Sequence, residues 1–192
     1  MKTIALCSVL AVSAPAFADP PAVRISVEAD PLDFAVYKGW SLFSVIQPEA
    51  FGPWAIRVGT GRAYLPKAFS ENGNTGWSFG FDPVTTIGVE RFFRERRGGL
   101  FAIAAAGYES MVFKGPMGDT TTLTAASLQV GGGYRYYPWD DLGLVLTIDV
   151  GAVSPIYRSK DPMLDGQTYK VPIVSPIAEL FVGWDFDVGT RR

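Results

Sequence analysis

The sequence contains no histidine among its 192 residues. Histidine is the most frequent general base in enzymes and a common zinc ligand, so its absence removes the usual routes to acyl transfer and zinc chemistry. No serine is spaced from a lysine in a recognisable nucleophile pattern. The adjacent carboxylates Asp140 and Asp141 have a sufficient explanation as turn formers. We therefore expect no catalytic residues, no metal site and no cofactor.

Cysteine is nearly absent as well, because the single copy, Cys7, lies in an N-terminal segment with the pattern of a secretory signal. Lys2 precedes an apolar run, and Ala16-Phe17-Ala18 supplies the small-residue cleavage pattern. Cleavage is expected there, which divides the chain into a signal peptide, residues 1–18, and a mature domain, residues 19–192. The mature domain then has no disulfide.

The mature sequence also lacks any run of 18 or more apolar residues. A helix that crosses a membrane needs about 20 such residues, so a helical span is excluded. Any crossing must then use strands, and in lipid every backbone polar group needs an internal partner. A closed barrel is the strand arrangement that meets this condition.

What the chain has instead is alternation, most clearly between Thr120 and Val153. Around a turn at 138–141, apolar residues occupy one parity and small or polar residues the other. The apolar set is Ala126, Leu128, Val130, Gly132, Tyr134 and Tyr136, then Leu142, Leu144, Leu146, Ile148 and Val150. The other set is Ser127, Gln129, Gly131, Gly133 and Arg135, then Gly143, Val145, Thr147, Asp149 and Gly151. This stretch predicts one long antiparallel hairpin with unlike faces.

Alternation alone does not say which face meets water, because a soluble ligand-binding barrel and a membrane barrel alternate in opposite senses. The polar face holds mainly Gly, Ser and Thr with isolated charges, whereas a solvated face usually carries many Lys and Glu. Tyr134 and Tyr136 lie where the strand nears its turn, which is the place of an aromatic girdle. The composition favours an apolar face against lipid.

Eight alternating segments can be counted along the chain. They are Ala22–Ala29, Val36–Gln47, Pro53–Tyr64, Asp82–Phe93, Leu100–Phe113, Thr120–Tyr137, Leu142–Tyr157 and Val174–Val188. The connections after the second, fourth and sixth segments are short, whereas Leu65–Phe81 and Arg158–Ile173 are long, and Asp30–Ala35 is expected to be a short external loop. Short periplasmic turns with longer external loops are typical of outer-membrane barrels. We predict an all-β fold: an eight-stranded antiparallel up-and-down transmembrane β-barrel.

The end of the last segment resembles the C-terminal signal that directs barrel proteins to the outer-membrane insertion machinery. Gly183, Phe186 and Val188 stand at its glycine and hydrophobic positions, although Phe181 stands where a polar residue is usual. We expect these three residues to act as an insertion signal, with the insertion machinery as a partner during biogenesis.

Several longer stretches carry a family resemblance. They are DPLDFAVYKGWSL, GLFAIAAAGYE, GGGYRYYPWDD, LVLTIDVGAV and GQTYKVPIVSPIAELFVGWDF. Together they resemble a group of small, functionally uncharacterised bacterial outer-membrane β-barrel proteins of OmpA/OmpX-like architecture. The resemblance covers most of the mature chain. It implies the barrel fold and a location in the outer membrane of a Gram-negative bacterium, and it implies no activity.

Charged residues on the polar parity would point into the barrel. They are Arg24, Glu28, Arg57, Glu90, Arg135, Asp149, Glu179 and Asp185. An eight-stranded barrel is too narrow for an open pore, so side chains must fill it and buried charges must pair. We expect a plug of salt bridges. A gated path for protons or small ions would use the same residues and stays open as the alternative.

Arg91, Arg94, Arg96 and Arg97 form a basic run around one short turn. A solvated turn explains this run, and contact with anionic phospholipid headgroups is the more specific hypothesis, since cations near such a surface are attracted by about 1 kcal/mol each. Nucleic acid is not expected as a partner, because the compartment is wrong. Trp77, in the first long loop, is interpreted as a membrane-interface anchor.

Taken together, these patterns predict a monomeric integral outer-membrane protein with a filled lumen, lipid contacts and a structural, adhesive or interaction role. The external ligand is not identified. Two alternatives remain: a periplasmic, lipocalin-like lipid-binding barrel with the apolar face inward, and a lipid-modifying outer-membrane enzyme that uses a base other than histidine.

Overall fold

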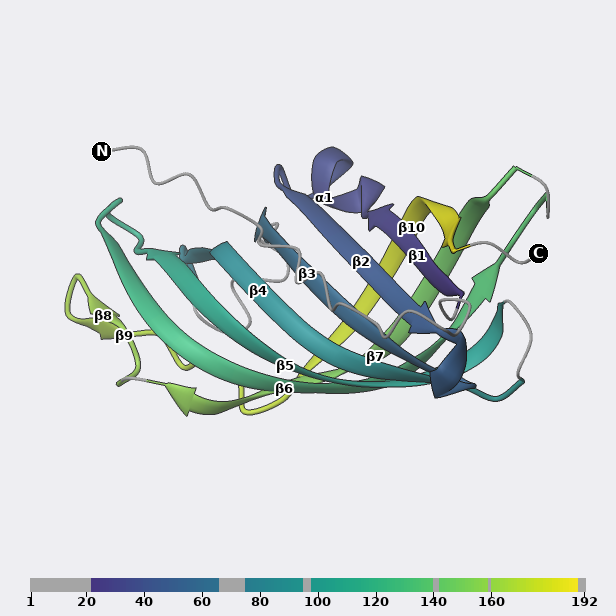
Figure 1. The fold of residues 1–192 in the computed structure, drawn as a ribbon. Helices are drawn as coiled ribbons and strands as arrows, with labels where there is room; N and C mark the ends of the chain where they lie inside the picture. The colour runs from purple at the N-terminus through teal and green to yellow at the C-terminus, as the bar shows by residue number, and fades with distance from the viewer. Residues whose placement is uncertain (1–21, 66–74, 95–97, 140–141, 159, 190–192) are drawn as a thin grey trace, which may run out of the picture.

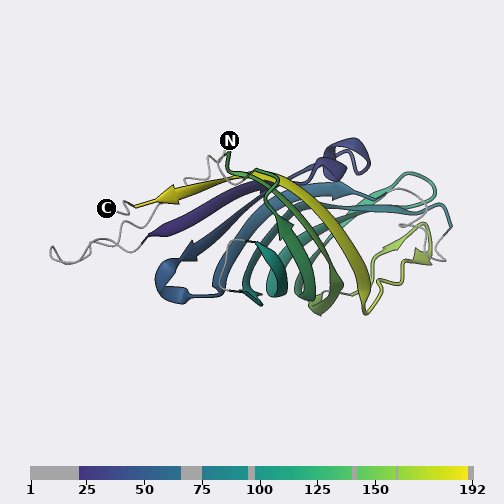
Figure 2. The same ribbon diagram turned by 90° about the vertical axis from the view of Figure 1, so that its right-hand side faces the viewer.

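The computed structural model describes residues 22–65, 75–94, 98–139, 142–158 and 160–189. Eight strands close into one antiparallel barrel in the order β1-β10-β7-β6-β5-β4-β3-β2 (Figures 1 and 2). The strands are β1 (Val23–Ala29), β2 (Trp40–Pro48), β3 (Trp54–Tyr64), β4 (Ser78–Phe92), β5 (Gly99–Lys114), β6 (Thr120–Tyr136), β7 (Leu144–Arg158) and β10 (Ser175–Val188). The predicted fold class is confirmed, and each predicted segment overlaps its strand closely.

The barrel closes where β1 pairs with β10, from Val23 opposite Val188 to Ala29 opposite Val182. The turns after β2, β4 and β6 lie at the end of the barrel where β1 begins and β10 finishes. The first of these turns contains the short 3-10 helix η1 (Glu49–Phe51). The predicted signal peptide, residues 1–18, lies outside the described residues, as do Arg96, Arg97, Asp140, Asp141 and residues 66–74.

The connection from β1 to β2 differs from the short loop predicted at Asp30–Ala35. Helix α1 (Pro31–Ala35) occupies it, and β2 starts at Trp40 rather than at Val36. A proline at the start of the helix and an Asp30 side chain that accepts the Leu32 N–H at 2.7 Å are favourable helix-start features. This local cap competes with strand pairing, so the strand begins later.

The strands differ strongly in length, since β1 has 7 residues and β2 has 9, whereas β5 has 16 and β6 has 17. The long strands therefore extend past the short ones at the end opposite the short turns. Figure 1 places β8 (Met163–Leu164) and β9 (Gln167–Thr168), a small hairpin between β7 and β10, beside this extension. The wall of the barrel is continued there by a sheet that covers only part of its circumference.

The inward face of this extension is covered by a hydrophobic cluster. Its buried members are Trp77, Met111, Phe113, Leu123, Ala125 and Tyr169. The Tyr169 ring, which comes from the long connection after β7, lies 5.1 Å from the Phe113 ring and 5.4 Å from the Trp77 ring. Trp77 is 1% exposed, so the interpretation of this residue as a membrane-interface anchor is wrong: it lies in a core that the long loops complete.

The exposure of side chains confirms the two predicted faces of the β6–β7 hairpin. Leu128 and Val130 are 48% and 59% exposed, whereas Ser127 and Arg135 on the other parity are each 3% exposed. The Gly-rich, sparsely charged face is the lumen, and the apolar face is the outer wall. The soluble-carrier alternative required the opposite arrangement, so the structure contradicts it.

Glycine on the inward parity makes room for large side chains in a narrow lumen. A Cβ atom at Gly133 would lie 2.6 Å from the Phe101 ring and 2.8 Å from the Asp149 Cβ, and one at Gly59 would lie 2.1 Å from the Phe43 ring. These distances are shorter than any allowed contact, so the aromatic rings occupy space that a side chain would need.

Replacing Gly133 with Ala should lower the free energy of unfolding by about 1–3 kcal/mol, the usual cost of overpacking a filled core. Gly132→Ala is the matched control, because its Cβ would point outward and meet only the Phe101 carbonyl oxygen at 3.0 Å. Thermal unfolding in detergent measures both. Equal losses in the two variants would contradict the assignment of faces.

Candidate functional site in the barrel lumen

Five of the eight predicted lumen charges meet in one buried cluster halfway along the short strands. They are Glu28 on β1, Arg57 on β3, Glu90 on β4, Arg135 on β6 and Asp149 on β7, each no more than 3% exposed. Alternation alone directs each side chain inward, but closure of the barrel brings the five strands around one axis. The cluster is therefore made of residues that lie far apart in the sequence.

The Glu90 carboxylate is at the centre of this cluster because both arginines bind it. Arg57 Nε lies 2.9 Å from Glu90 Oε1, and Arg135 Nη1 lies 3.1 Å from Glu90 Oε2. Each guanidinium therefore faces one carboxylate oxygen. Charge-assisted hydrogen bonds of this kind are among the strongest in proteins.

A further carboxylate lies on the outer side of each arginine. Arg135 Nη2 donates to Glu28 Oε1 at 2.9 Å, and Arg57 Nη1 donates to Asp149 Oδ2 at 2.7 Å. The result is a chain in the order Glu28, Arg135, Glu90, Arg57, Asp149. Its charges alternate along the chain, so each arginine lies between two carboxylates.

Hydroxyl groups complete the polar contacts of this chain. Ser26 Oγ donates to Glu28 Oε1 at 2.9 Å, and Arg135 Nε donates to Thr147 Oγ1 at 3.1 Å. Both hydroxyls are buried and both lie on the lumen parity of their strands. Such donors and acceptors offset part of the cost of removing charges from water.

Aromatic rings enclose both guanidinium groups. Arg135 Cζ lies 5.3 Å from the Phe92 ring and 5.6 Å from the Phe101 ring. Arg57 Cζ lies 4.7 Å from the Phe181 ring and 5.5 Å from the Phe43 ring. Cation–π attraction of this kind is strongest where water is excluded.

Phe181 departs from the usual insertion-signal pattern, and its environment explains why. The residue is 0% exposed and faces the lumen, where its ring packs against Arg57 and lies 4.9 Å from the Phe43 ring. A polar residue at this position would remove the apolar wall on one side of the arginine. Packing in this particular lumen therefore requires an aromatic residue.

The three remaining predicted lumen charges lie outside the five-residue cluster. Arg24 is at the mouth near the chain ends, 3.6 Å from Asp185 and 3.3 Å from Asp187. Glu179 is half-buried directly opposite Asp149 on the neighbouring strand and accepts a hydrogen bond from Gln129 at 3.4 Å. These residues line the lumen without joining the central chain of ion pairs.

One buried carboxylate was missed by the sequence reasoning. Glu109 is 6% exposed and accepts a hydrogen bond from Ser127 on the adjacent strand. It shares the inward parity of Phe101 and Ile103 on β5, so the alternation of that strand was sufficient to place it. It lies toward the hydrophobic cluster at the far end of the lumen.

The predicted insertion-signal residues all lie on β10 but face two directions. A Cβ at Gly183 would lie 2.7 Å from the Glu28 Cγ, so this glycine makes room for the central cluster. Phe186 and Val188 are about half exposed on the outer wall, opposite Ile25 and Val23 of β1. The latter two are therefore accessible at the strand that closes the barrel.

The cluster offers acids and guanidinium groups but no nucleophile paired with a base. Within the described ranges, no group of three or more His, Cys, Asp or Glu side chains could hold a metal ion. A search of the same residues found no helix long and apolar enough to cross a membrane. What the arrangement does is join five strands across the lumen and fill the space between them.

Two solved structures are similar to this chain. One is Neisserial surface protein A, with a TM-score of 0.50 and 13% sequence identity over 85% of this chain and 94% of that one. The other is a major outer membrane protein from Thermus thermophilus, with a TM-score of 0.53 and 17% identity over 85% of this chain and 99% of that one. No family model and no curated protein sequence matches. At these identities the similarity establishes the fold.

Removal of Arg135 should lower the free energy of unfolding by about 3–5 kcal/mol, because it leaves buried carboxylates without a partner. A second change, Glu28→Gln, should recover part of the loss, since Glu28 pairs with no other arginine in the described part of the chain. Glu90→Gln should recover less, because Glu90 keeps Arg57 and its loss weakens that pair. A double-mutant cycle on detergent-folded protein measures these couplings.

Arg24→Ala is the control for this cycle, because Arg24 is partly exposed at the mouth and exposed ion pairs contribute about 0–1 kcal/mol. A loss for Arg135→Ala no larger than that control would contradict the plug. Conductance across a planar bilayer tests the alternative, since an ion path predicts a changed conductance with little change in stability.

Proposed function

We propose that this chain is an integral outer-membrane barrel whose plugged lumen supports a structural or interaction role rather than transport or catalysis. The observation that carries the proposal is the outer wall. Large apolar side chains there are widely exposed, including Ile87 at 60%, Val130 at 59%, Ile148 at 55% and Val150 at 59%. A continuous apolar wall of this kind is unfavourable in water and favourable in lipid.

The height of the apolar band supports the same conclusion. On β5, Leu100 and Tyr108 are 61% and 62% exposed, with alanines on the same face between them. They are separated by about 27 Å along the strand at ~3.4 Å per residue, which is about 20 Å across the membrane at the usual barrel tilt. Outer-membrane barrels have an apolar band about 25 Å tall.

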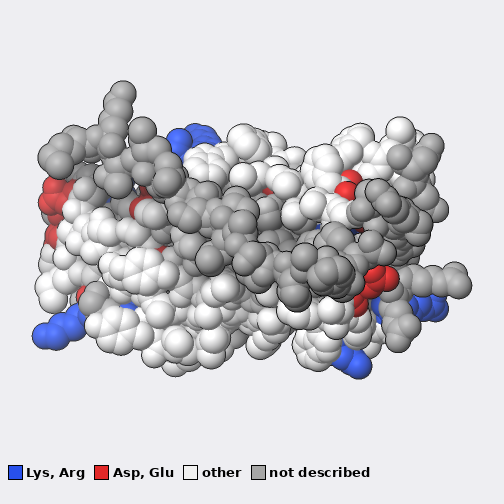
Figure 3. All heavy atoms as spheres, viewed as in Figure 1, with Lys and Arg blue, Asp and Glu red and all other residues white. Residues whose placement is uncertain are grey.

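Aromatic residues lie where this band ends. Trp54, Tyr134, Tyr136 and Trp184 are exposed near the short turns, and Tyr108 and Tyr157 lie toward the opposite end. Such residues favour the level of the lipid headgroups. On the face that Figure 3 shows, most charged atoms gather toward the two ends of the molecule, and the surface between them is mainly uncharged.

The filled lumen supports a role other than a channel or an enzyme. Two arginines, three carboxylates and several aromatic rings occupy the space around the barrel axis. The chain has no histidine, and the central carboxylates are engaged by the arginines. No observation favours the lipid-modifying enzyme.

The end with the long strands is the region suited to an interaction. Short turns are typical of the periplasmic side, which places the long strands and the β8–β9 hairpin outside the cell. Apolar side chains there are highly exposed, with Met117 at 79% and Met163 at 67%. Sheet strands and the hydrophobic cluster support these residues, so this end offers a firm surface to an external partner.

Ile148→Arg should impair insertion, because an arginine near the bilayer midplane costs about 2–4 kcal/mol. Tyr157→Arg on the same strand lies near the external end of the band, where the cost falls to about 0–1 kcal/mol. Membrane fractionation and the gel mobility of heated against unheated samples measure insertion. Equal tolerance of both changes, with the protein in a soluble fraction, would contradict an outer-membrane location.

Phe186→Ala should leave more unassembled protein in the periplasm if this residue recruits the insertion machinery. Phe93→Ala is the matched control, because Phe93 is 61% exposed near the same end of the barrel but lies outside the last strand. Quantitative blots of periplasmic and membrane fractions provide the readout. Similar assembly of the two variants would mean that Gly183, Phe186 and Val188 reflect only strand packing.

A further inference from the structure

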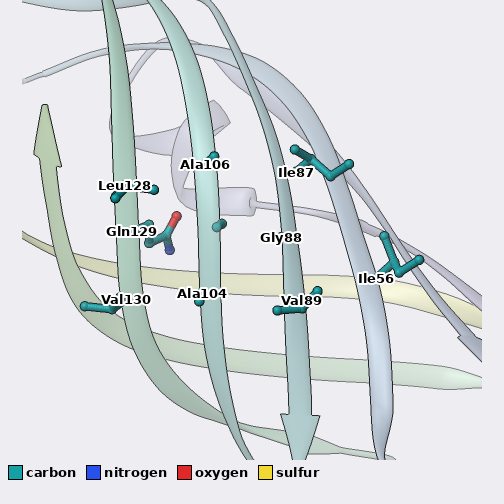
Figure 4. Close-up of a pocket in the computed structure, with 10 residues that line it drawn as sticks. Ile56, Ile87, Gly88, Val89, Ala104, Ala106, Leu128, Gln129 and Val130 are labelled. Atoms are coloured by element: carbon teal, nitrogen blue, oxygen red, sulfur yellow. The ribbon is translucent and has the colours of Figure 1, made fainter. Parts of the chain in front are cut away.

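The outer wall is not uniform, because a shallow apolar groove with a volume of about 520 Å³ crosses β3 to β6 (Figure 4). Its outward-facing walls are formed by Ile56, Ile87, Val89, Leu128 and Val130. The floor follows β5, where Ala104 and Ala106 carry only methyl groups. In a protein whose outer wall meets lipid, the occupant of such a groove is a component of the membrane or another membrane protein.

Strand register makes the groove narrow and straight. Ala104 lies directly between Val89 of β4 and Val130 of β6, and the next outward residue, Ala106, is likewise flanked by two larger side chains. Ala102 continues the row, with Gly132 as its neighbour on β6. The floor from Ala102 to Ala106 is about 14 Å long at ~3.4 Å per residue, close to half of the ~30 Å hydrocarbon core.

A cation lies at the end of the groove next to the short turns. Arg91 on β4 pairs directly with Ala102, and its side chain is exposed on the outer wall. Its guanidinium lies 5.7 Å from the Trp54 ring and 5.9 Å from the Phe93 ring, which hold it at the level of the aromatic girdle. In the described part of the chain it forms no ion pair with a carboxylate.

We propose that this groove binds one acyl chain of a glycerophospholipid in the periplasmic leaflet, with the lipid phosphate on Arg91. The inference rests on the proposed membrane location. It follows from charge and length together: the groove spans one leaflet, and the cation lies at the depth where a headgroup phosphate lies. A planar guanidinium with several N–H donors suits a phosphate, and stacking on Trp54 and Phe93 reduces the freedom it would lose on binding.

The groove also explains why β5 carries small residues on its outer face. A lipid-facing strand gains from large apolar side chains, and the neighbouring strands have them. Alanines at 102, 104 and 106 give up that contact on one strand only. A bound acyl chain restores the missing contacts, because it fills the channel between the rows of larger side chains.

Native mass spectrometry of the detergent-folded barrel tests the site with two probes, phosphatidylglycerol and diacylglycerol, which share acyl chains but differ in the phosphate. Arg91→Gln should weaken phosphatidylglycerol binding about tenfold, the size expected for one hydrogen bond to a charged group, and leave diacylglycerol binding unchanged. The double variant Ala104→Leu and Ala106→Leu fills the channel and should weaken both probes.

The controls are Arg62→Gln, which removes an exposed arginine near the opposite end of β3, and Ala178→Leu, which adds the same bulk to the outer wall on β10. The site is overturned if Arg91→Gln binds phosphatidylglycerol as Arg62→Gln does, or if the leucine pair binds both probes as Ala178→Leu does. It is also overturned if the leucine pair instead splits a dimer of the wild-type chain, since a second copy would then occupy the groove. Loss of heat-dependent gel mobility in the wild type would contradict the membrane barrel itself.

Discussion

Two arginines share the Glu90 carboxylate inside the barrel, and the lumen depends on this contact. A carboxylate or guanidinium transferred into a low-dielectric interior loses several kcal/mol of hydration, which one partner alone rarely offsets. Here Glu90 has a guanidinium on each oxygen, and each guanidinium has a second carboxylate beyond it. The alternating chain lets five charges be buried together where any one alone would be expensive.

This arrangement also determines what surrounds it. Because the guanidinium groups occupy the axis, the residues facing them must be flat or absent. Phenylalanine rings pack on both arginines, and glycines such as Gly133 and Gly183 leave space where another side chain would collide. The same strands carry large apolar residues on their other face. The two faces of each strand thus meet opposite requirements, a crowded polar interior and an apolar exterior.

Beyond the plug, the barrel changes character along its axis. The short strands β1 and β2 end near the charged cluster, while β5 and β6 continue and need another cover for their inward face. Trp77 and Tyr169, which come from the two long connections, supply it. Those connections are therefore part of the fold as well as loops, and they support the exposed residues at the external end.

Much of this architecture was predictable from local patterns. The alternation around Leu128 and Arg135 assigns each residue to a face, because neighbouring side chains on a strand point in opposite directions. The lengths of the connections indicate which end carries the short turns. The same alternation on β5 would have placed Glu109 inside. The helix at Pro31–Ala35 was missed because its signal, a cap at Asp30 followed by proline, covers too few residues to interrupt the alternating pattern.

By itself, then, the sequence determined the fold class, the number of strands and the face of each side chain, since these depend on the period of single strands and on the lengths of connections. Only the tertiary structure decided which charges pair. Glu28 and Arg135 are 107 positions apart and meet across the lumen at a depth set by the stagger of eight strands. It also decided that Trp77 is buried and that Phe181 packs on Arg57. Closure of the sheet brings these groups together, and no local period records the distance across a barrel.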